Sequence, residues 1–144
     1  MLPFNVALTT GESPYRQIVY AATRAVVSGE LPEGSAFPSV RELSQALKIN
    51  PNTAHKVVAE LVRNGLLEVM PGLGTIVSVG RKSSAAERRD LLSNEVEQLV
   101  VEAMRLGLKE VDVLNAFSAR WAELSAPQSV VKSAAAAVLT GRNA

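Results

Sequence analysis

Apolar residues recur at helical spacing in three blocks of the first half of the chain. Within each block the steps are mostly of three or four residues, which places the apolar side chains on one face of a helix. The three faces consist of Ile18, Ala21, Ala22, Ala25 and Val26; of Leu43, Ala46 and Leu47; and of Ala54, Val57, Val58, Leu61 and Val62. The pattern therefore predicts three helices that each bury one side.

Capping residues set the limits of the first two helices. Ser13 is a suitable N-cap and Pro14 a suitable first helical residue, because a proline there loses no helical hydrogen bond. Gly29 is placed to close this helix. Ser39, followed three residues later by Glu42, predicts a capping box at the start of the second helix, which ends near residues 47–48.

The stretch "INPNTAHKVV" contains a proline just where the helical spacing resumes. Asn50 can cap a third helix and Pro51 can occupy its first position, so that the proline starts this helix and does not interrupt one. Only "KIN" separates the second helix from the third, and Gly65 ends the third. The pattern predicts two helices joined by a tight turn.

Three further runs have the character of strands. "LLEVM" and "GTIVSV", joined by "PGL", predict a β-hairpin. Near the N-terminus Phe4, Val6 and Leu8 alternate with smaller or polar residues, which predicts a short strand. Glycines at the hairpin tip, Gly72 and Gly74, would let its backbone approach another surface closely.

The second half of the chain predicts two more helices after the linker "GRKSS". Ser84 and Glu87 form a capping box for a long helix that reaches about Leu106 and stops at Gly107, and a further helix ends before Pro127. Their apolar stripe, at alternating steps of three and four, is Leu92, Val96, Leu99, Ala103, Leu106, Leu114, Phe117, Trp121 and Leu124. Residues 127–144 are expected to form a weakly ordered or helical tail.

Composition excludes several classes of site. The 144 residues contain no cysteine and a single histidine, His55, so disulfides, thiolate chemistry and multi-histidine metal sites are excluded. No catalytic constellation is present, and we expect neither an enzyme nor a cofactor or metal. There is no signal sequence and no apolar run of roughly 18 residues, so we expect a cytoplasmic protein with no membrane partner.

The predicted order of elements is that of a winged helix-turn-helix. We therefore expect a mainly α fold with a small β wing in residues 1–80, followed by two dimerisation helices in residues 81–126. An exposed third helix of this kind fits the DNA major groove. The net charge is only +1, however, and residues 1–80 contain six Lys or Arg and six Glu. DNA binding then requires the two signs to lie on different faces, and a protein-interaction module without DNA binding stays the alternative.

A long, ordered set of motifs resembles the DNA-binding domain of GntR-type bacterial transcription regulators. The set runs over residues 14–77 and includes "SGELPEG", "FPSVREL", "NPNTAHKVVAELVRNGLL" and "GLGTIV". The short C-terminal part and the "FNV" start are similar to the YtrA-like subfamily, in which two helices follow the domain and serve dimerisation. Many relatives have an arginine where this chain has Pro51 and a basic wing tip where it has Met70 and Pro71, although "NPNT" is common among YtrA-like proteins.

The resemblance implies a set of DNA contacts. In such proteins the arginine of "PSVRE", the start of the recognition helix and the wing glycine touch DNA. With the capping serine of "PSVRE" and the second wing glycine, the predicted DNA-binding residues are Ser39, Arg41, Asn50, Asn52, Thr53, His55, Lys56, Gly72 and Gly74. Asn52 is our preferred direct base reader, because asparagine pairs bidentately with adenine, and Lys56 is expected to touch phosphate.

Together these features predict a dimeric, sequence-specific repressor. The apolar stripe is too large to remain uncovered in a monomer, and a partner copy would place two recognition helices about 34–36 Å apart on an inverted-repeat DNA operator. An unidentified small-molecule effector could bind near Arg120 and Trp121. The YtrA-like resemblance also suggests that a transporter operon is regulated.

Overall fold

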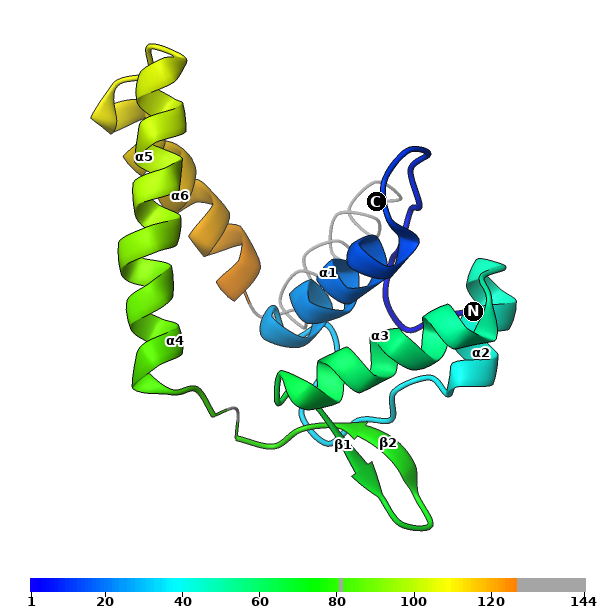
Figure 1. The fold of residues 1–144 in the computed structure, drawn as a ribbon. Helices are drawn as coiled ribbons and strands as arrows, with labels where there is room; N and C mark the ends of the chain where they lie inside the picture. Colours follow the sequence, from blue (N-terminus) through cyan, green and yellow to red (C-terminus); the bar gives the residue numbers. More distant parts are fainter. Residues whose placement is uncertain (81, 127–144) are drawn as a thin grey trace, which may run out of the picture. The chain divides into compact units, whose positions relative to one another are not determined.

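The computed structural model describes residues 1–80 and 82–126, which form two compact units (Figure 1). We call residues 1–80 the N-terminal unit and residues 82–126 the C-terminal unit. The predicted tail, residues 127–144, lies outside the described residues. Within the two described ranges no helix is long and apolar enough to cross a membrane.

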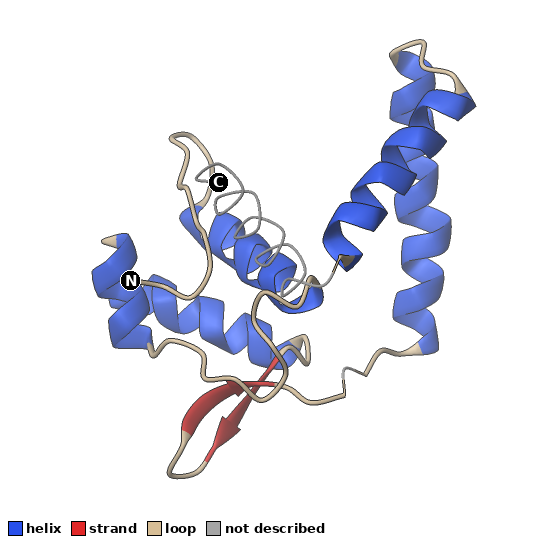
Figure 2. Ribbon diagram, turned by 180° about the vertical axis from the view of Figure 1, so that it is seen from behind, coloured by secondary structure: helices blue, strands red, loops and turns tan. Residues whose placement is uncertain are grey.

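The N-terminal unit consists of three helices followed by an antiparallel hairpin (Figure 2). These elements are α1 (Pro14–Val27), α2 (Val40–Leu47), α3 (Pro51–Arg63), β1 (Leu67–Met70) and β2 (Gly74–Val77). In the hairpin Leu67 pairs with Val77 and Met70 pairs with Gly74. The predicted mainly α fold with a small β wing is confirmed.

The predicted starts of α1 and α3 are confirmed by their side-chain caps. The Ser13 hydroxyl accepts a hydrogen bond from the Arg16 N–H at 3.4 Å. The Asn50 side-chain oxygen accepts one from the Asn52 N–H at 2.8 Å, and Pro51 is the first residue of α3. The proline thus begins α3 immediately after the turn that follows α2.

The start of α2 differs in one detail from its prediction. The Ser39 hydroxyl accepts the Glu42 N–H at 3.1 Å, as expected of a cap. The Glu42 carboxylate, however, accepts from the Ser39 hydroxyl at 3.2 Å and not from its backbone amide, so only half of the capping box forms. The predicted burial of Ala46 is also wrong, because the side chain is exposed and Ser44 is buried instead.

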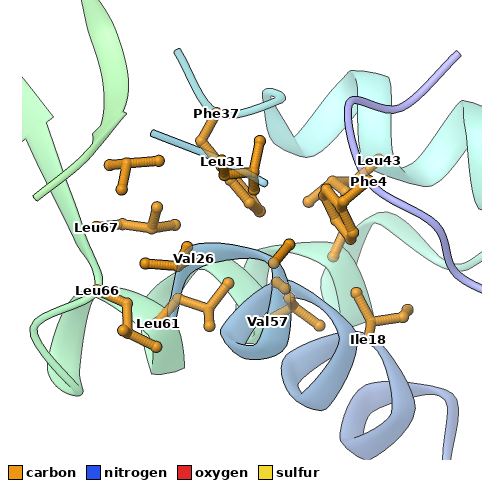
Figure 3. Close-up of a cluster of buried hydrophobic side chains, with 14 residues drawn as sticks. Phe4, Ile18, Val26, Leu31, Phe37, Leu43, Val57, Leu61, Leu66 and Leu67 are labelled. Carbon is orange, nitrogen blue, oxygen red and sulfur yellow. The ribbon is translucent and has the colours of Figure 1, made fainter. Parts of the chain in front are cut away.

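The core of the N-terminal unit lies where α1 and α2 pack against α3 (Figure 3). Leu66 and Leu67 tie the start of the hairpin to the same cluster, which fixes the wing to α3. The cluster contains Phe4, Ile18, Ala22, Ala25, Val26, Leu31, Phe37, Leu43, Ala54, Val57, Leu61, Leu66, Leu67 and Val77. Most are aliphatic, as the low aromatic content requires.

The strand predicted near the N-terminus is wrong. Phe4 is buried and stacks on Phe37 with ring centroids 5.7 Å apart, whereas Leu8 is exposed. Residues 34–37 lie along the second edge of β2 instead, with the Phe37 N–H donating to the Thr75 carbonyl at 2.9 Å. This edge of β2 is therefore occupied by residues 34–37, and Phe4 packs into the core beside Phe37 without joining the sheet.

The C-terminal unit is a helical hairpin. Its first arm runs without a break through α4 (Ala85–Asp90), the π-helical turn η1 (Leu91–Glu95) and α5 (Val96–Arg105), and its second arm is α6 (Glu110–Ser125). The capping box of Ser84 and Glu87 is confirmed, with both hydrogen bonds formed at 3.0 and 3.2 Å. The π-helical turn has no counterpart in the sequence prediction.

Candidate nucleic-acid interface

The recognition helix α3 has one buried face and one polar face. Ala54, Val57 and Leu61 point into the core. Of the predicted readers, Asn52, His55 and Lys56 are exposed and Thr53 is half-buried. In both Figure 1 and Figure 2, α1 lies on one side of α3 and the hairpin projects on the other. The face of α3 turned away from α1 and the wing therefore lie on the same side of the unit.

Asn50 has a structural role that precedes any contact with DNA. Its side-chain oxygen is occupied by the cap of α3, so only its amide N–H groups are available as donors to a phosphate. Ser39 is similarly engaged, because its hydroxyl proton points to Glu42. The structure thus places both residues beside the predicted interface, in positions where they orient α2 and α3.

Positive charge is available on the helix-turn-helix. Arg41 on α2 and Lys56 on α3 are exposed, and neither forms an ion pair with any residue of the described ranges. Lys48, in the turn between the two helices, is exposed and unpaired in the same sense. These three cations are therefore available to neutralise DNA phosphates.

The one acidic side chain of α3, that of Glu60, has other partners than these cations. Glu60 is half-buried and forms an ion pair with Arg63 at 2.6 Å. It also accepts a hydrogen bond from Tyr15 on α1, whose hydroxyl pKa is raised above its ordinary value, first by burial and then by the Glu60 carboxylate. The first two turns of α3 contain no Asp or Glu at all, so the formal neutrality of residues 1–80 does not extend to this part of the helix.

The tip of the wing is a tight turn with an accessible backbone. The Leu73 N–H donates to the Met70 carbonyl at 3.0 Å, with Pro71 and Gly72 between them. Gly72 has φ +81° and Gly74 has φ +88°, values that side chains disfavour, while a Cβ at either position would meet no atom within 4 Å. The glycines are thus required by the turn conformation, and they leave the tip free to approach a ligand.

Two features of the unit were missed by sequence reasoning. Lys48 adopts a left-handed conformation, with φ +53°, and is the one non-glycine residue with positive φ in the described part of the chain. Val69 and Leu73 of the wing are strongly exposed apolar residues. The sequence pattern identifies "KIN" and "PGL" as turns but does not indicate that Lys48 presents a charge, and Leu73 an apolar group, at the surface.

The C-terminal unit is almost entirely exposed. Ala103 is the one apolar residue of residues 82–126 that is buried, and Leu124 is half-buried. The other residues predicted for dimerisation are exposed, namely Leu92, Val96, Leu99, Leu106, Leu114, Phe117 and Trp121. Between α5 and α6 lies an apolar groove of about 490 Å³, whose lining includes Leu99, Leu114 and Phe117.

The two residues near which an effector site is predicted, Arg120 and Trp121, have different partners on α6. Arg120 forms an ion pair with Glu123 at 2.8 Å, and Trp121 stacks on Phe117 with ring centroids 5.6 Å apart. Neither lines the groove between α5 and α6. Within the described ranges there is also no group of three or more side chains suited to hold a metal ion. An effector site near Arg120 stays a prediction.

The short α2, the tight turn, the exposed α3 and the adjoining hairpin define a winged helix-turn-helix protein. The family model described as "Bacterial regulatory proteins, gntR family" matches residues 14–77. The HTH-type transcriptional repressor YtrA of Bacillus subtilis is 32% identical over 96 residues, which cover 66% of this chain and 74% of YtrA. The chain therefore belongs to the GntR family of bacterial regulators, in its YtrA-like group, and its winged helix is a DNA-binding domain.

Two other comparisons agree with this assignment. The HTH-type transcriptional regulator YhcF of Bacillus subtilis, which carries the description "uncharacterized", is 35% identical over 101 residues, covering 69% of this chain and 83% of YhcF. A crystal structure described as a transcriptional antiterminator from Listeria monocytogenes superposes with a TM-score of 0.74. It covers 86% of this chain and 93% of its own at 23% identity, a likeness that concerns the fold.

Proposed function

We propose that this protein is a homodimeric transcriptional repressor that binds an inverted-repeat DNA operator. The observation that carries the proposal is the exposed face of α3, which presents polar and basic groups and no carboxylate over its first two turns. The similar YtrA is named a transcriptional repressor. The relatives that the chain matches are regulators of transcription, and we assign it no enzymatic activity.

The contacts divide into readers and anchors. Asn52 and His55 are exposed on the first turns of α3, where side chains reach base edges in the major groove, and asparagine can pair with adenine. Thr53 is half-buried beside them. Arg41 and Lys56, which form no ion pair within residues 1–80 and 82–126, would neutralise phosphates. The backbone of Gly72 and Gly74 would approach the duplex at the wing.

The homodimer is supported by what the C-terminal unit lacks. A 45-residue helical hairpin with one buried apolar residue cannot be stable as a separate unit in water. A second copy of the same hairpin would cover the exposed stripe of α5 and α6, and twofold symmetry makes the covered surface the same on both chains. Such a dimer would place two α3 helices on half-sites about 34–36 Å apart.

The DNA contacts can be tested by titrating the full-length protein against labelled DNA from upstream of its own gene and the neighbouring genes, with transporter genes first. Arg41→Ala and Lys56→Ala should each lower affinity and reduce the slope of log affinity against log salt by about one. Arg16→Ala is the matched control, because Arg16 is an exposed cation on α1 and should leave both quantities unchanged.

The alternative is a winged helix that binds another protein and no DNA. The formal neutrality of residues 1–80 favours it, whereas the separation of charge on α3 favours DNA. Binding that is insensitive to DNA sequence and to salt, or equal in the Arg41→Ala and Arg16→Ala variants, would exclude the repressor. The proposed DNA binding does not depend on a small-molecule effector. A metabolite that abolishes operator binding when it is added would be identified as one.

A further inference from the structure

The wing of this protein has an apolar tip. Leu73 is 75% exposed and Val69 is 65% exposed, and Met70 beside them is also exposed. Between residues 67 and 77 the one charged side chain is Glu68, and there is no lysine, arginine or histidine. This hairpin therefore has no cation with which to bind a phosphate group.

Leu73 lies in a hydrogen-bonded turn with its side chain exposed. It follows Pro71 and Gly72, and its N–H is bonded to the Met70 carbonyl at 3.0 Å. Gly72 and Gly74 flank it without side chains, and Leu73 is the most exposed of the apolar wing residues Val69, Met70 and Leu73. Because the turn fixes the backbone in advance, little conformational entropy is lost when the tip enters a binding site.

The position of the hairpin decides what the tip can meet. Leu66 and Leu67 are buried in the core directly after α3, and residues 34–37 pair with the far edge of β2. In Figure 1 and Figure 2 the hairpin projects on the side of α3 away from α1, which is the side of the polar face. When α3 occupies a major groove, the tip of an adjoining hairpin on that side faces the backbone and the next minor groove.

We infer that Leu73 enters this minor groove and is a specificity-determining residue of the protein, an inference that rests on the proposed DNA binding. An apolar side chain cannot use the charged phosphates, but it can contact deoxyribose carbons and the groove floor, as apolar wedges in minor-groove proteins do. The exocyclic amino group of guanine projects into this groove, whereas A·T pairs leave its floor open. Leu73 thus selects A·T pairs under the wing.

The contribution of Leu73 differs in kind from that of Arg41 or Lys56. A contact between apolar groups releases no counterions, so its loss should not change the salt dependence of binding. In Leu73→Ser we expect affinity for the operator to fall about tenfold, with an unchanged salt slope. In Leu73→Lys we expect the salt slope to steepen by about one and the preference for A·T pairs to weaken.

Modified bases in the operator test whether the minor groove is the site of contact. Replacing the adenines under the wing by 2,6-diaminopurine adds an amino group in the minor groove and leaves the N6 and N7 groups that are read in the major groove. Wild-type protein should bind this operator several-fold more weakly. The affinity of Leu73→Ser should fall far less on the same replacement, because the side chain that meets the new amino group is shorter.

Two control variants separate the outcomes. Val27→Ser replaces an exposed aliphatic residue on α1 and should bind DNA as the wild type does, and melting curves of all variants should coincide. If Lys56→Ala weakens binding while Leu73→Ser and the modified DNA have no effect, the inference about Leu73 fails and the proposed function stands. If wild type binds no DNA, both fail. If Leu73→Ser weakens self-association without affecting DNA binding, the tip contacts protein and the inference is wrong.

Discussion

The two units of this chain differ in how much of their apolar surface they bury. The N-terminal unit buries a cluster of fourteen apolar residues drawn from three helices, the hairpin and the N-terminal segment. In the C-terminal unit two helical arms form a hairpin, and Ala103 is the one apolar residue that they bury. The first unit has a core of its own, whereas the second has the material for a core and no second layer to cover it.

The ion pairs of the C-terminal unit do not make up this difference. Arg105 pairs with Glu102, and its guanidinium lowers the pKa of that carboxyl below its usual value, while Arg120 pairs with Glu123. Both are exposed pairs three residues apart on one helix, and such pairs contribute little to stability. The N-terminal unit is thus stabilised by its own packing, whereas the proposed homodimer would supply the burial that the C-terminal unit lacks.

The largest expected effect of a single change is in the N-terminal core. Leu61 is fully buried on α3, and Leu61→Ala should lower the free energy of unfolding of this unit by about 2–5 kcal/mol, because it leaves a cavity. Urea unfolding followed by circular dichroism measures the loss. The single tryptophan, Trp121, lies in the C-terminal unit, so its emission reports that unit separately.

The matched control for Leu61→Ala is Val62→Ala, at the next residue of α3. Val62 is 36% exposed, and its shortening should change stability by about 0.5 kcal/mol or less. The proposed difference between the two units would be contradicted if Leu61→Ala shifted the urea midpoint of Trp121 emission as much as that of the circular dichroism signal. The units would then unfold as one, and the N-terminal core would stabilise both.

The next largest effect should come from placing a charge in the exposed groove of the C-terminal unit. Leu99 is 50% exposed in the single chain, so an isolated chain would tolerate Leu99→Asp at little cost. If a partner covers this position, the aspartate is buried without a counterion. We then expect the dissociation constant of the dimer to rise more than about 100-fold, which corresponds to roughly 3 kcal/mol. Sedimentation equilibrium measures this constant.

A neighbouring residue provides the control for Leu99→Asp. Gln98 is exposed on the same helix and does not line the groove, so Gln98→Asp adds the same charge outside the surface that we expect to be covered. Equal dissociation of the two variants would mean that net charge weakens the dimer. A wild-type chain that is monomeric at every concentration would contradict dependence of this unit on association.

The same contrast explains which elements could be predicted from the sequence. The starts of α1, α3 and the long helix follow from Ser13, Asn50 and Ser84, because a cap is a local interaction between residues two or three apart. The predicted strand at Phe4 is wrong because a strand needs a pairing partner elsewhere in the fold, and the segment that pairs with β2 is residues 34–37. Likewise Ala46 matched the helical spacing of α2, but the neighbours of α2 determine that Ser44 is buried.

Tertiary structure also limited the prediction of the two surfaces. The stripe from Leu92 to Leu106 assumed regular α-helix, whereas the Val96 N–H bonds to the Leu91 carbonyl in a π-helical turn. That turn shifts the register assumed for the stripe, and Leu92, its first member, does not line the groove between α5 and α6. On the DNA-binding side, residue types identified Arg41 and Lys56 as cations. Their freedom from ion pairs, and the withdrawal of Glu60 towards Tyr15, could be learned only from the packing of α3 against α1.

The smallest expected effect concerns Lys48, in the turn that orients α3 within the N-terminal unit. Its left-handed conformation ends α2 and lets the Ile49 N–H reach the Ser44 carbonyl at 3.1 Å, a helix end that glycine forms without steric cost. Lys48→Gly should therefore be more stable than Lys48→Ala by about 1 kcal/mol, since both lose the charge and only glycine removes the Cβ. Thermal unfolding of the two variants measures this difference, and Trp121 emission should not report it. Equal melting temperatures would show that the turn relaxes and that the N-terminal unit is less rigid than its core implies.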